Sequence, residues 1–382
     1  MSTIAFLNIG MHGRVNPTLP VVAELVRRGH SVTYHTSPAF SAEIAAAGAK
    51  VHPYPGGDLP LPDPPTPPTL ITGLTRTALS LLPTVLAELR DIRPDLIVHD
   101  SACPWGSVAA SQLGVPAASS FTTFAYNRRT PSPTRASWEL LTTPAFLRAR
   151  LELSRRYRTG KLPFFDLGNI RQPLNLVFTS PEFQLGAADF DDSYRFVGPS
   201  IGARPADPSF PADQLKDPVL YASLGTVFAA DPQVLRTFAA ALAPLGGTVV
   251  ISTGATDPAA LGPLPGNVLA LHSTPQPQVL ARAAMFVTHG GMNSANEALY
   301  AGVPMLVVPQ GADQPLVASR VAALGAGLAL DPADVSVDAV RARAQRLLDE
   351  PVFRAAAAGL RQAQRQAGGA RRAADELERR LS

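Results

Sequence analysis

The sequence predicts an α/β protein of two doubly wound domains, each with a parallel β-sheet covered by helices. Short apolar runs alternate with helical patterns along the chain, which is typical of parallel sheets. A proline-rich segment at 202–217 separates two such series. The length of 382 residues also exceeds one ordinary core and is enough for about two domains.

The first half is predicted to open as a β-α-β-α-β unit. Asn16 is expected to cap the first helix, with Pro17 in its first turn. A proline-rich loop at 53–69 can be neither helix nor inner strand, and a long loop there is expected to border a binding cleft. A helix follows at 70–92, whereas 121–172 has no clear periodicity. The predicted strands of this half are 3–9, 31–36, 50–54, 95–99, 115–120, 175–180 and 195–199.

The second half repeats the pattern after the linker. It includes a helix near 232–243, and the amphipathic C-terminal segment is expected to form a helix that packs back across the domain boundary. Its predicted strands are 218–225, 247–253, 267–273, 285–291 and 304–310. The expected organisation is a first domain (1–205), a linker (206–217), a second domain (218–365) and a C-terminal helix (366–382).

Composition limits the classes of function. Hydrophobic residues make up 46% and charged residues 16%, which is a globular balance. A net charge of +3 without a basic stripe argues against a nucleic-acid partner. The single cysteine, Cys103, fits a reducing compartment and a buried apolar position. The N-terminus lacks a signal-peptide pattern, and no apolar stretch approaches a membrane span, so a soluble cytoplasmic protein is expected.

Polar residues at strand ends indicate one shared ligand site. In doubly wound sheets, ligands bind beyond the carboxyl ends of the strands. The residues concerned are His12, Asp100, Ser223 to Thr226 and His289. We therefore expect a binding cleft between the two domains.

The segment 286–304 is predicted to bind an anion. It reads as a strand, two glycines and a helix, and the first turn of such a helix carries unpaired N–H groups and a partial positive charge. His289 would add a donor to the same phosphate. The alternative is a capping box formed by Ser294 and Glu297, which needs no ligand. Asp313 and Gln314 follow the next strand and are able to hydrogen-bond sugar hydroxyls, or to form a solvated turn.

These motifs resemble the family 1 nucleotide-sugar glycosyltransferases, which have the GT-B fold of two Rossmann-like domains facing a central cleft. The sequence is most similar to bacterial members that glucosylate macrolides, flavonoids and other natural products. The similarity covers nearly the whole chain and is carried by "VNPTLPVVAELVRRGHSVTY", "FVGPS" and "TPQPQVLARAAMFVTHGGMNSANEALYAGVPMLVVPQGADQ". It implies an inverting transferase that moves a hexose onto a hydroxyl of a lipophilic acceptor.

The resemblance also implies a set of donor-binding residues. Those at the diphosphate are His289, Asn293 and Ser294 beside Gly291; Glu297 and Gln276 lie at the ribose; Thr226, Asp313 and Gln314 lie at the phosphates or sugar. Family members often carry a tryptophan that stacks on the base where this chain has Ser273. The Asp–Gln pair favours a glucose-type sugar, so UDP-glucose is preferred over a dTDP-sugar as the donor.

No metal or cofactor is expected. The sequence "DFD" at 189–191 matches the D-x-D of metal-dependent transferases, but it lies in a polar segment away from the strand ends and is interpreted as a turn. A helix dipole together with His289 is able to stabilise the departing diphosphate without Mg²⁺.

The identity of the catalytic base is left open by the sequence. In the family it is usually a histidine, held by an aspartate that matches Asp100, but Arg14 occupies the histidine position and stays protonated. We favour His12, because residues i and i+2 of an extended loop point the same way. Three alternatives stay open. Asp100 takes the proton itself with Arg14 orienting it, an acidic phenol needs little base, or Arg14 pairs with Asp100 and blocks the site.

The acceptor pocket is expected in the first domain. Its candidate lining residues, each of which fits a core position equally well, are Leu82, Phe121, Phe124, Tyr126, Phe164 and Phe165. Rival functions are a nucleotide-sugar 2-epimerase of the same fold and a non-catalytic donor-binding partner of another transferase. A nicotinamide dehydrogenase is disfavoured because no G-x-G-x-x-G follows the first strand. A monomer or homodimer is expected.

Overall fold

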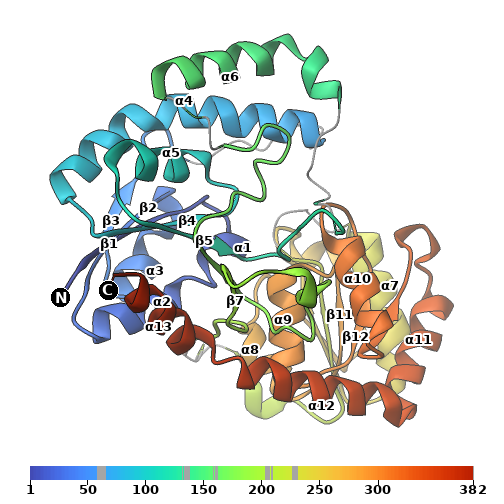
Figure 1. Cartoon of the computed structure of the whole chain (residues 1–382). Helices are drawn as coiled ribbons and strands as arrows, with labels where there is room; N and C mark the ends of the chain where they lie inside the picture. The colour runs from blue at the N-terminus through green and yellow to red at the C-terminus, as the bar shows by residue number, and fades with distance from the viewer. Residues whose placement is uncertain are drawn as a thin grey trace. The chain divides into compact units, whose positions relative to one another are not determined.

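The structure is a computed structural model, and it describes residues 1–57, 66–130, 132, 138–157, 159, 162–202, 207, 210–225 and 231–381. The chain divides into two compact units (Figure 1). Unit 1 comprises Met1–Gly202 and Ala367–Ser382, and unit 2 comprises Ala203–Gln366. Each unit contains one parallel sheet, as the sequence predicts.

Unit 1 is built on a seven-stranded sheet of order β3-β2-β1-β4-β5-β6-β7. The strand order reverses beside β1, whose neighbours are β2 and β4, and doubly wound sheets bind ligands at such a reversal. The residues that follow β1 and end β4 are therefore in the position expected of a site. The strands are β1 (Thr3–Leu7), β2 (Ser31–Thr36), β3 (Lys50–Pro53), β4 (Leu96–Asp100), β5 (Ala117–Phe121), β6 (Leu174–Val177) and β7 (Tyr194–Phe196).

Alternate residues of β1 pack into two separate cores, because successive side chains of a strand point to opposite faces. Ala5 and Leu7 face the core that includes α4 (Pro67–Ile92), α5 (Pro104–Leu113) and α6 (Pro144–Tyr157). Ile4 and Phe6 face the other core, with α2 (Leu19–Arg27), α3 (Ser41–Ala46) and α13 (Gly369–Leu381). Figure 1 shows these two helical layers on either side of the sheet.

The C-terminal helix α13 belongs to unit 1 and packs against α2. Leu377 is fully buried there, and Arg28 of α2 pairs with Asp375 and Glu378. We expect Leu377→Ala to lower the free energy of unfolding of unit 1 by about 2–5 kcal/mol, because it removes buried methyl groups and leaves a cavity. Trp105 and Trp138 are the only tryptophans, and both belong to unit 1.

Tryptophan fluorescence during urea unfolding therefore reports on this unit alone. The matched control is Val352→Ala, since Val352 is 60% exposed on α12 (Pro351–Gln366) of unit 2. It should leave the midpoint of the tryptophan transition unchanged. Equal midpoints for the native chain and Leu377→Ala would contradict the view that α13 stabilises unit 1.

Unit 2 has a six-stranded sheet of order β10-β9-β8-β11-β12-β13. Its strand order reverses between β8 and β11, which pair directly. One face packs against α7 (Pro232–Leu242) and α11 (Val337–Asp349); on the other, Tyr221 stacks on Phe286 with ring centroids 4.6 Å apart. The strands are β8 (Val219–Ser223), β9 (Thr248–Ser252), β10 (Val268–Leu271), β11 (Ala283–Thr288), β12 (Met305–Val307) and β13 (Gly327–Ala329).

The structure corrects the predicted helix starts. The first helix does not begin at Asn16: a short helix α1 (His12–Val15) precedes it, Asn16 ends α1, and α2 begins after Thr18. The helix α4 begins at Pro67, inside the segment that was expected to exclude a helix. Proline is tolerated in a first turn, where its missing N–H would be unpaired in any case, and the Thr66 side chain caps this turn. The helix α6 and the strand β13 were not predicted.

One helix, α4, comes near a membrane span once its interruption by the charged Arg76 is allowed. This helix is long and apolar enough to cross a membrane by length and composition. Its residues Ile71, Ala78 and Leu82 are buried in the core of unit 1, which is how an apolar helix of a globular protein is used.

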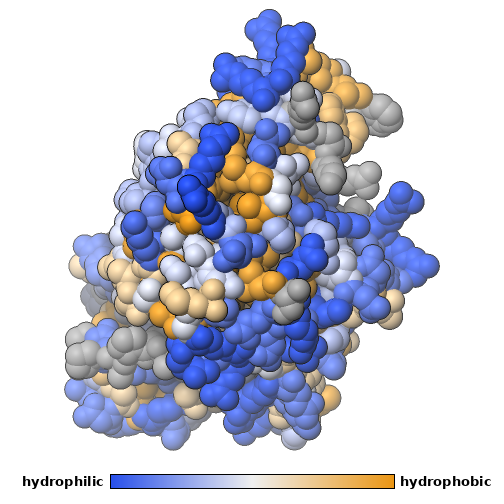
Figure 2. All heavy atoms as spheres, turned by 60° about the vertical axis from the view of Figure 1, so that its left-hand side comes forward, coloured by the Kyte–Doolittle hydropathy of each residue, from blue (hydrophilic) through white to orange (hydrophobic). Residues whose placement is uncertain are grey.

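The face drawn in Figure 2 is largely hydrophilic, with a group of hydrophobic residues exposed within it.

Candidate active site

The predicted anion cradle forms where β11 meets α9 (Met292–Ala301) in unit 2. His289 leaves the strand, and Gly291 is the N-cap of the helix. A Cβ atom on Gly291 would lie 2.4 Å from Nε2 of His289, and one on Gly225 would lie 2.7 Å from its Cε1. Only glycine allows the backbone to pass this close to the imidazole, so both glycines fix the position of the ring.

His289 is neutral at physiological pH. Burial lowers its pKa to about 4, against an opposing effect of the Ser223 main chain. A neutral imidazole has a single N–H, so the ring donates to a phosphate oxygen only when that N–H leaves the Ser223 main chain. The positive potential at this end of β11 therefore comes from α9, whose first amides precede the bond from Ala295 N to Gly291 O.

Gln276 connects the residues that the resemblance assigns to the ribose. Its Nε2 donates to Oε2 of Glu297 at 2.8 Å and to Oγ of Ser294 at 3.2 Å, and its Oε1 accepts from the Tyr221 hydroxyl at 3.2 Å. The capping-box alternative is wrong, because Gly291 is the N-cap and Ser294 lies within the helix. Gln276 thus orients Glu297, and Glu297 is not part of a capping box.

The Asp–Gln pair lies at the start of α10 (Gln314–Ala323). Asp313 is its N-cap residue, but the carboxylate does not cap the helix. Oε1 of Gln314 accepts from the main-chain N–H groups of Gln310 and Gly311, at 2.7 and 3.2 Å. These bonds fix the side chain and direct its NH₂ end, the donor, away from the loop. Thr226 lies outside the described residues, and Ser273 is exposed.

Arg14 and Asp100 form an ion pair in unit 1. Nη1 of Arg14 lies 3.4 Å from both carboxylate oxygens and 3.3 Å from Oγ1 of Thr122. Asp100 is almost fully buried and accepts a further bond from Ala102 N at 2.8 Å. Burial raises the pKa of Asp100, and the charge of Arg14 opposes that rise. Sequence reasoning missed Thr122, although its position just after β5 gave the same strand-end signal.

The argument that an extended loop directs His12 toward Asp100 was wrong. Both His12 and Arg14 lie in α1, and side chains two positions apart in a helix point about 200° apart around its axis. The His12 ring contacts Phe40 edge-on, with centroids 4.9 Å apart, and the residue is exposed. Arg14 is the side chain that forms the ion pair with Asp100.

His99, the residue before Asp100, has the structural role expected of it. Its Nδ1 contacts the Asp100 carbonyl oxygen and its Nε2 contacts Nε2 of Gln172, both at 2.8 Å. Burial lowers the pKa of His99 to about 4, so the ring is neutral. A Cβ atom on Gly106 would lie 2.4 Å from the Cβ of His99, so the helix α5 packs closely on this strand.

The acceptor candidates are mostly core residues. Leu82, Phe121, Phe124 and Tyr126 are at most 4% exposed, which matches the core position that the sequence allowed for each of them: packing accounts for them without a ligand. Phe164 and Phe165 are partly buried against the core, with ring centroids 4.8 Å apart. They are the two candidates that retain some exposure.

The segment 189–191 is a turn. Asp189 ends a short 3₁₀ helix and pairs with Arg129, whereas Asp191 accepts hydrogen bonds from Ser193.

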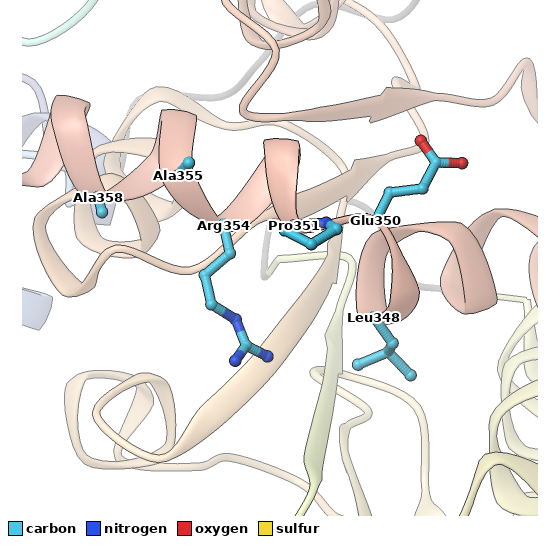
Figure 3. Close-up of a pocket in the computed structure, with 6 residues that line it drawn as sticks. All are labelled: Leu348, Glu350, Pro351, Arg354, Ala355 and Ala358. Carbon is cyan, nitrogen blue, oxygen red and sulfur yellow. The ribbon is translucent and has the colours of Figure 1, made fainter.

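Figure 3 shows a separate hollow at the junction of α11 and α12, to which none of the candidate site residues contributes. Its lining residues are Leu348, Glu350, Pro351, Arg354, Ala355 and Ala358.

Known proteins with similar sequences are glycosyltransferases. The family model described as "Erythromycin biosynthesis protein CIII-like, C-terminal domain" matches residues 236–377. The NDP-glycosyltransferase YjiC of Bacillus subtilis (strain 168) is 33% identical, over 98% of this chain and 96% of that protein. The oleandomycin glycosyltransferase of Streptomyces antibioticus is 32% identical, over 99% of this chain and 90% of that protein.

A solved structure shares the fold along its whole length. The glycosyltransferase of kitacinnamycin superposes with a TM-score of 0.88 at 30% identity, covering 100% of this chain and 99% of that chain. The fold is thus that of a GT-B glycosyltransferase. The chain belongs to the family of natural-product glycosyltransferases represented by these relatives, and the expected fold class, family and enzyme class are confirmed.

Proposed function

We propose that this enzyme transfers a hexose, with glucose from UDP-glucose as the first choice, to a phenolic hydroxyl of a lipophilic natural product such as a flavonoid or polyketide. The pairing of Arg14 with Asp100 is the observation that carries this proposal. A guanidinium at the position of the usual base stays charged, so it favours an acceptor that already approaches an anion. Phenols meet that requirement far better than aliphatic alcohols.

Unit 2 holds the donor in this proposal. The neutral His289 and the first amides of α9 bind the diphosphate, and Glu297, oriented by Gln276, accepts hydrogen bonds from the ribose hydroxyls. Gln314 offers its NH₂ group to the sugar. A helix N-terminus stabilises the departing diphosphate through its dipole, so transfer needs no added Mg²⁺ and no cofactor.

Unit 1 holds the acceptor and removes the proton of its hydroxyl group in this proposal. Asp100 accepts the proton of the attacking hydroxyl or orients Arg14, which stabilises the developing phenolate. The buried carboxylate is suited to this role because burial raises its pKa toward that of a useful base. Phe164 and Phe165 remain proposed contacts for the lipophilic acceptor, and a cytoplasmic location remains part of the proposal.

A transfer assay with a panel of acceptors tests this function. We expect the native enzyme to transfer hexose from UDP-glucose to phenols at least 10-fold faster than to aliphatic alcohols of similar size. Arg14→His should narrow that difference by restoring a titratable base, and His12→Ala should change the rate less than 3-fold. Mass spectrometry of the products measures each rate, and dTDP-glucose serves as the competing donor.

Three outcomes would contradict the proposal. A rate for aliphatic alcohols equal to that for phenols would remove the role given to Arg14. A loss of about 100-fold in His12→Ala, the scale of a general base, would return the proton transfer to His12. UDP binding without transfer to any acceptor would favour a non-catalytic partner protein in which Arg14 blocks the site by pairing with Asp100.

A further inference from the structure

Three potential metal ligands meet in unit 1, on the face of the sheet covered by α4. His35 on β2 and His52 on β3 are paired across the two strands, so their side chains lie on the same face. Their rings stack with centroids 4.7 Å apart. Glu88 of α4 reaches the same point, with Oε2 3.1 Å from Nδ1 of His35 and 3.6 Å from Nδ1 of His52.

The hydrogen bonding of His35 is incomplete. The residue is 0% exposed, and its Nδ1 faces Glu88 at 3.1 Å without the geometry of a hydrogen bond. Buried polar atoms nearly always find a partner, because leaving them unpaired forfeits the hydration that they had in the unfolded chain. An ion bound between Nδ1 of His35 and the Glu88 carboxylate would supply a partner for this nitrogen.

We propose that His35, His52 and Glu88 bind one divalent transition-metal ion of the Zn²⁺ class, which links α4 to the edge of the sheet. The three ligand atoms all lie within 4.8 Å of one another. A tetrahedral Zn²⁺ with bonds of about 2.0–2.1 Å places its ligand atoms about 3.3 Å apart. The distances of 3.1 and 3.6 Å from Glu88 fall on either side of that value, and the two imidazoles close on the ion from within the 4.8 Å limit.

Two histidines and one carboxylate are a known ligand set for zinc, with a fourth position left for water. The ion has a structural role in this proposal, since it ties Glu88 of α4 to the paired strands β2 and β3. It takes no part in glycosyl transfer, so the proposal is independent of the donor, the acceptor and the base suggested above.

Metal binding to the purified full-length chain provides the test. After removal of bound metal with a chelator, titration with Zn²⁺ should show one ion per chain with a micromolar or lower Kd. Co²⁺ in place of Zn²⁺ should give the intense visible absorption of four-coordinate cobalt. Zn²⁺ should also raise the thermal midpoint of the tryptophan fluorescence transition, which reports on unit 1.

Variants locate the ion. Glu88→Gln and His52→Asn alter partly exposed side chains, so both should fold; each is expected to weaken Zn²⁺ binding at least 10-fold and to abolish the thermal shift. The control is His272→Asn, an exposed histidine of unit 2 that should have no effect. The proposal is overturned if the native chain binds no Zn²⁺ at 100 μM, or if the His52 and Glu88 variants bind it as tightly as the native chain.

Discussion

Replacing Asp100 by asparagine is expected to lower kcat/KM for a phenolic acceptor by about 10²- to 10⁴-fold, the range spanned by general acid–base catalysis. The amide keeps the shape of the carboxylate and the bond from Ala102 N, but it neither accepts a proton nor neutralises Arg14. The measurement is the rate of hexose transfer from UDP-glucose as a function of acceptor concentration. The pH dependence should flatten on the acidic side, where protonation of Asp100 limits the native enzyme.

The control for this variant is Thr122→Val. It removes the contact of Thr122 with Arg14 and leaves the ion pair in place, so the rate should fall only a few-fold. Tryptophan fluorescence verifies that both variants fold, and calorimetric titration with UDP verifies that unit 2 still binds the nucleotide. A properly folded Asp100→Asn variant that retains more than a tenth of native kcat/KM would show that the acceptor loses its proton without this residue.

The alternation of strands and helices could be predicted well because it depends on local patterns. The strand at 31–36 was predicted with its observed bounds, since a run rich in β-branched and aromatic residues there follows a helix-ending glycine. The glycine-bounded helix after His289 was also predicted. Such elements are specified by residues close in sequence, so the local sequence pattern is sufficient to find them.

The turn that carries His12 and Arg14 could not be predicted in this way. Nδ2 of Asn8 donates to the Arg14 carbonyl and to the Tyr34 hydroxyl, and Thr18 donates to the Val15 carbonyl and contacts the same hydroxyl. These bonds join segments from two strands and hold α1 in its helical form. Taken by itself, the segment with His12 and Arg14 looks like a polar loop after a strand. That pattern suggests an extended backbone, which led us to favour His12 as the partner of Asp100.

The cluster around Glu88 is a second example. His35 and His52 lie in two separate strands, and nothing in their local sequences links them. Their meeting depends on the register of β2 on β3, and the third member comes from a helix more than thirty residues further along. Register and helix placement are set by the packing of the whole unit, which sequence patterns specify only indirectly.

His289→Ala is expected to lower kcat by about 10²- to 10³-fold, the loss seen when one preorganised donor to a developing negative charge is removed. The buried imidazole is held by Gly225 and Gly291, so the ring keeps its position when the diphosphate leaves. Transfer kinetics at saturating UDP-glucose measure the effect. The matched control is His272→Ala, which removes an exposed histidine of the same unit and should leave kcat unchanged.

The pH dependence of UDP affinity distinguishes a neutral His289 that donates a hydrogen bond from a protonated His289 that binds through its charge. Its pKa of about 4 lies below the ordinary value of 6.5, so the ring is already neutral at pH 6 and stays neutral as the pH rises. Any change due to its titration in the free enzyme would appear only as the pH falls toward 4. If His289 binds the diphosphate as a neutral donor, UDP affinity should stay constant between pH 6 and 8 in the native chain. A fall in affinity across that range which is absent from His289→Ala would mean that the ring binds as a cation, and that the N-terminus of α9 is not the main source of positive potential in the cradle.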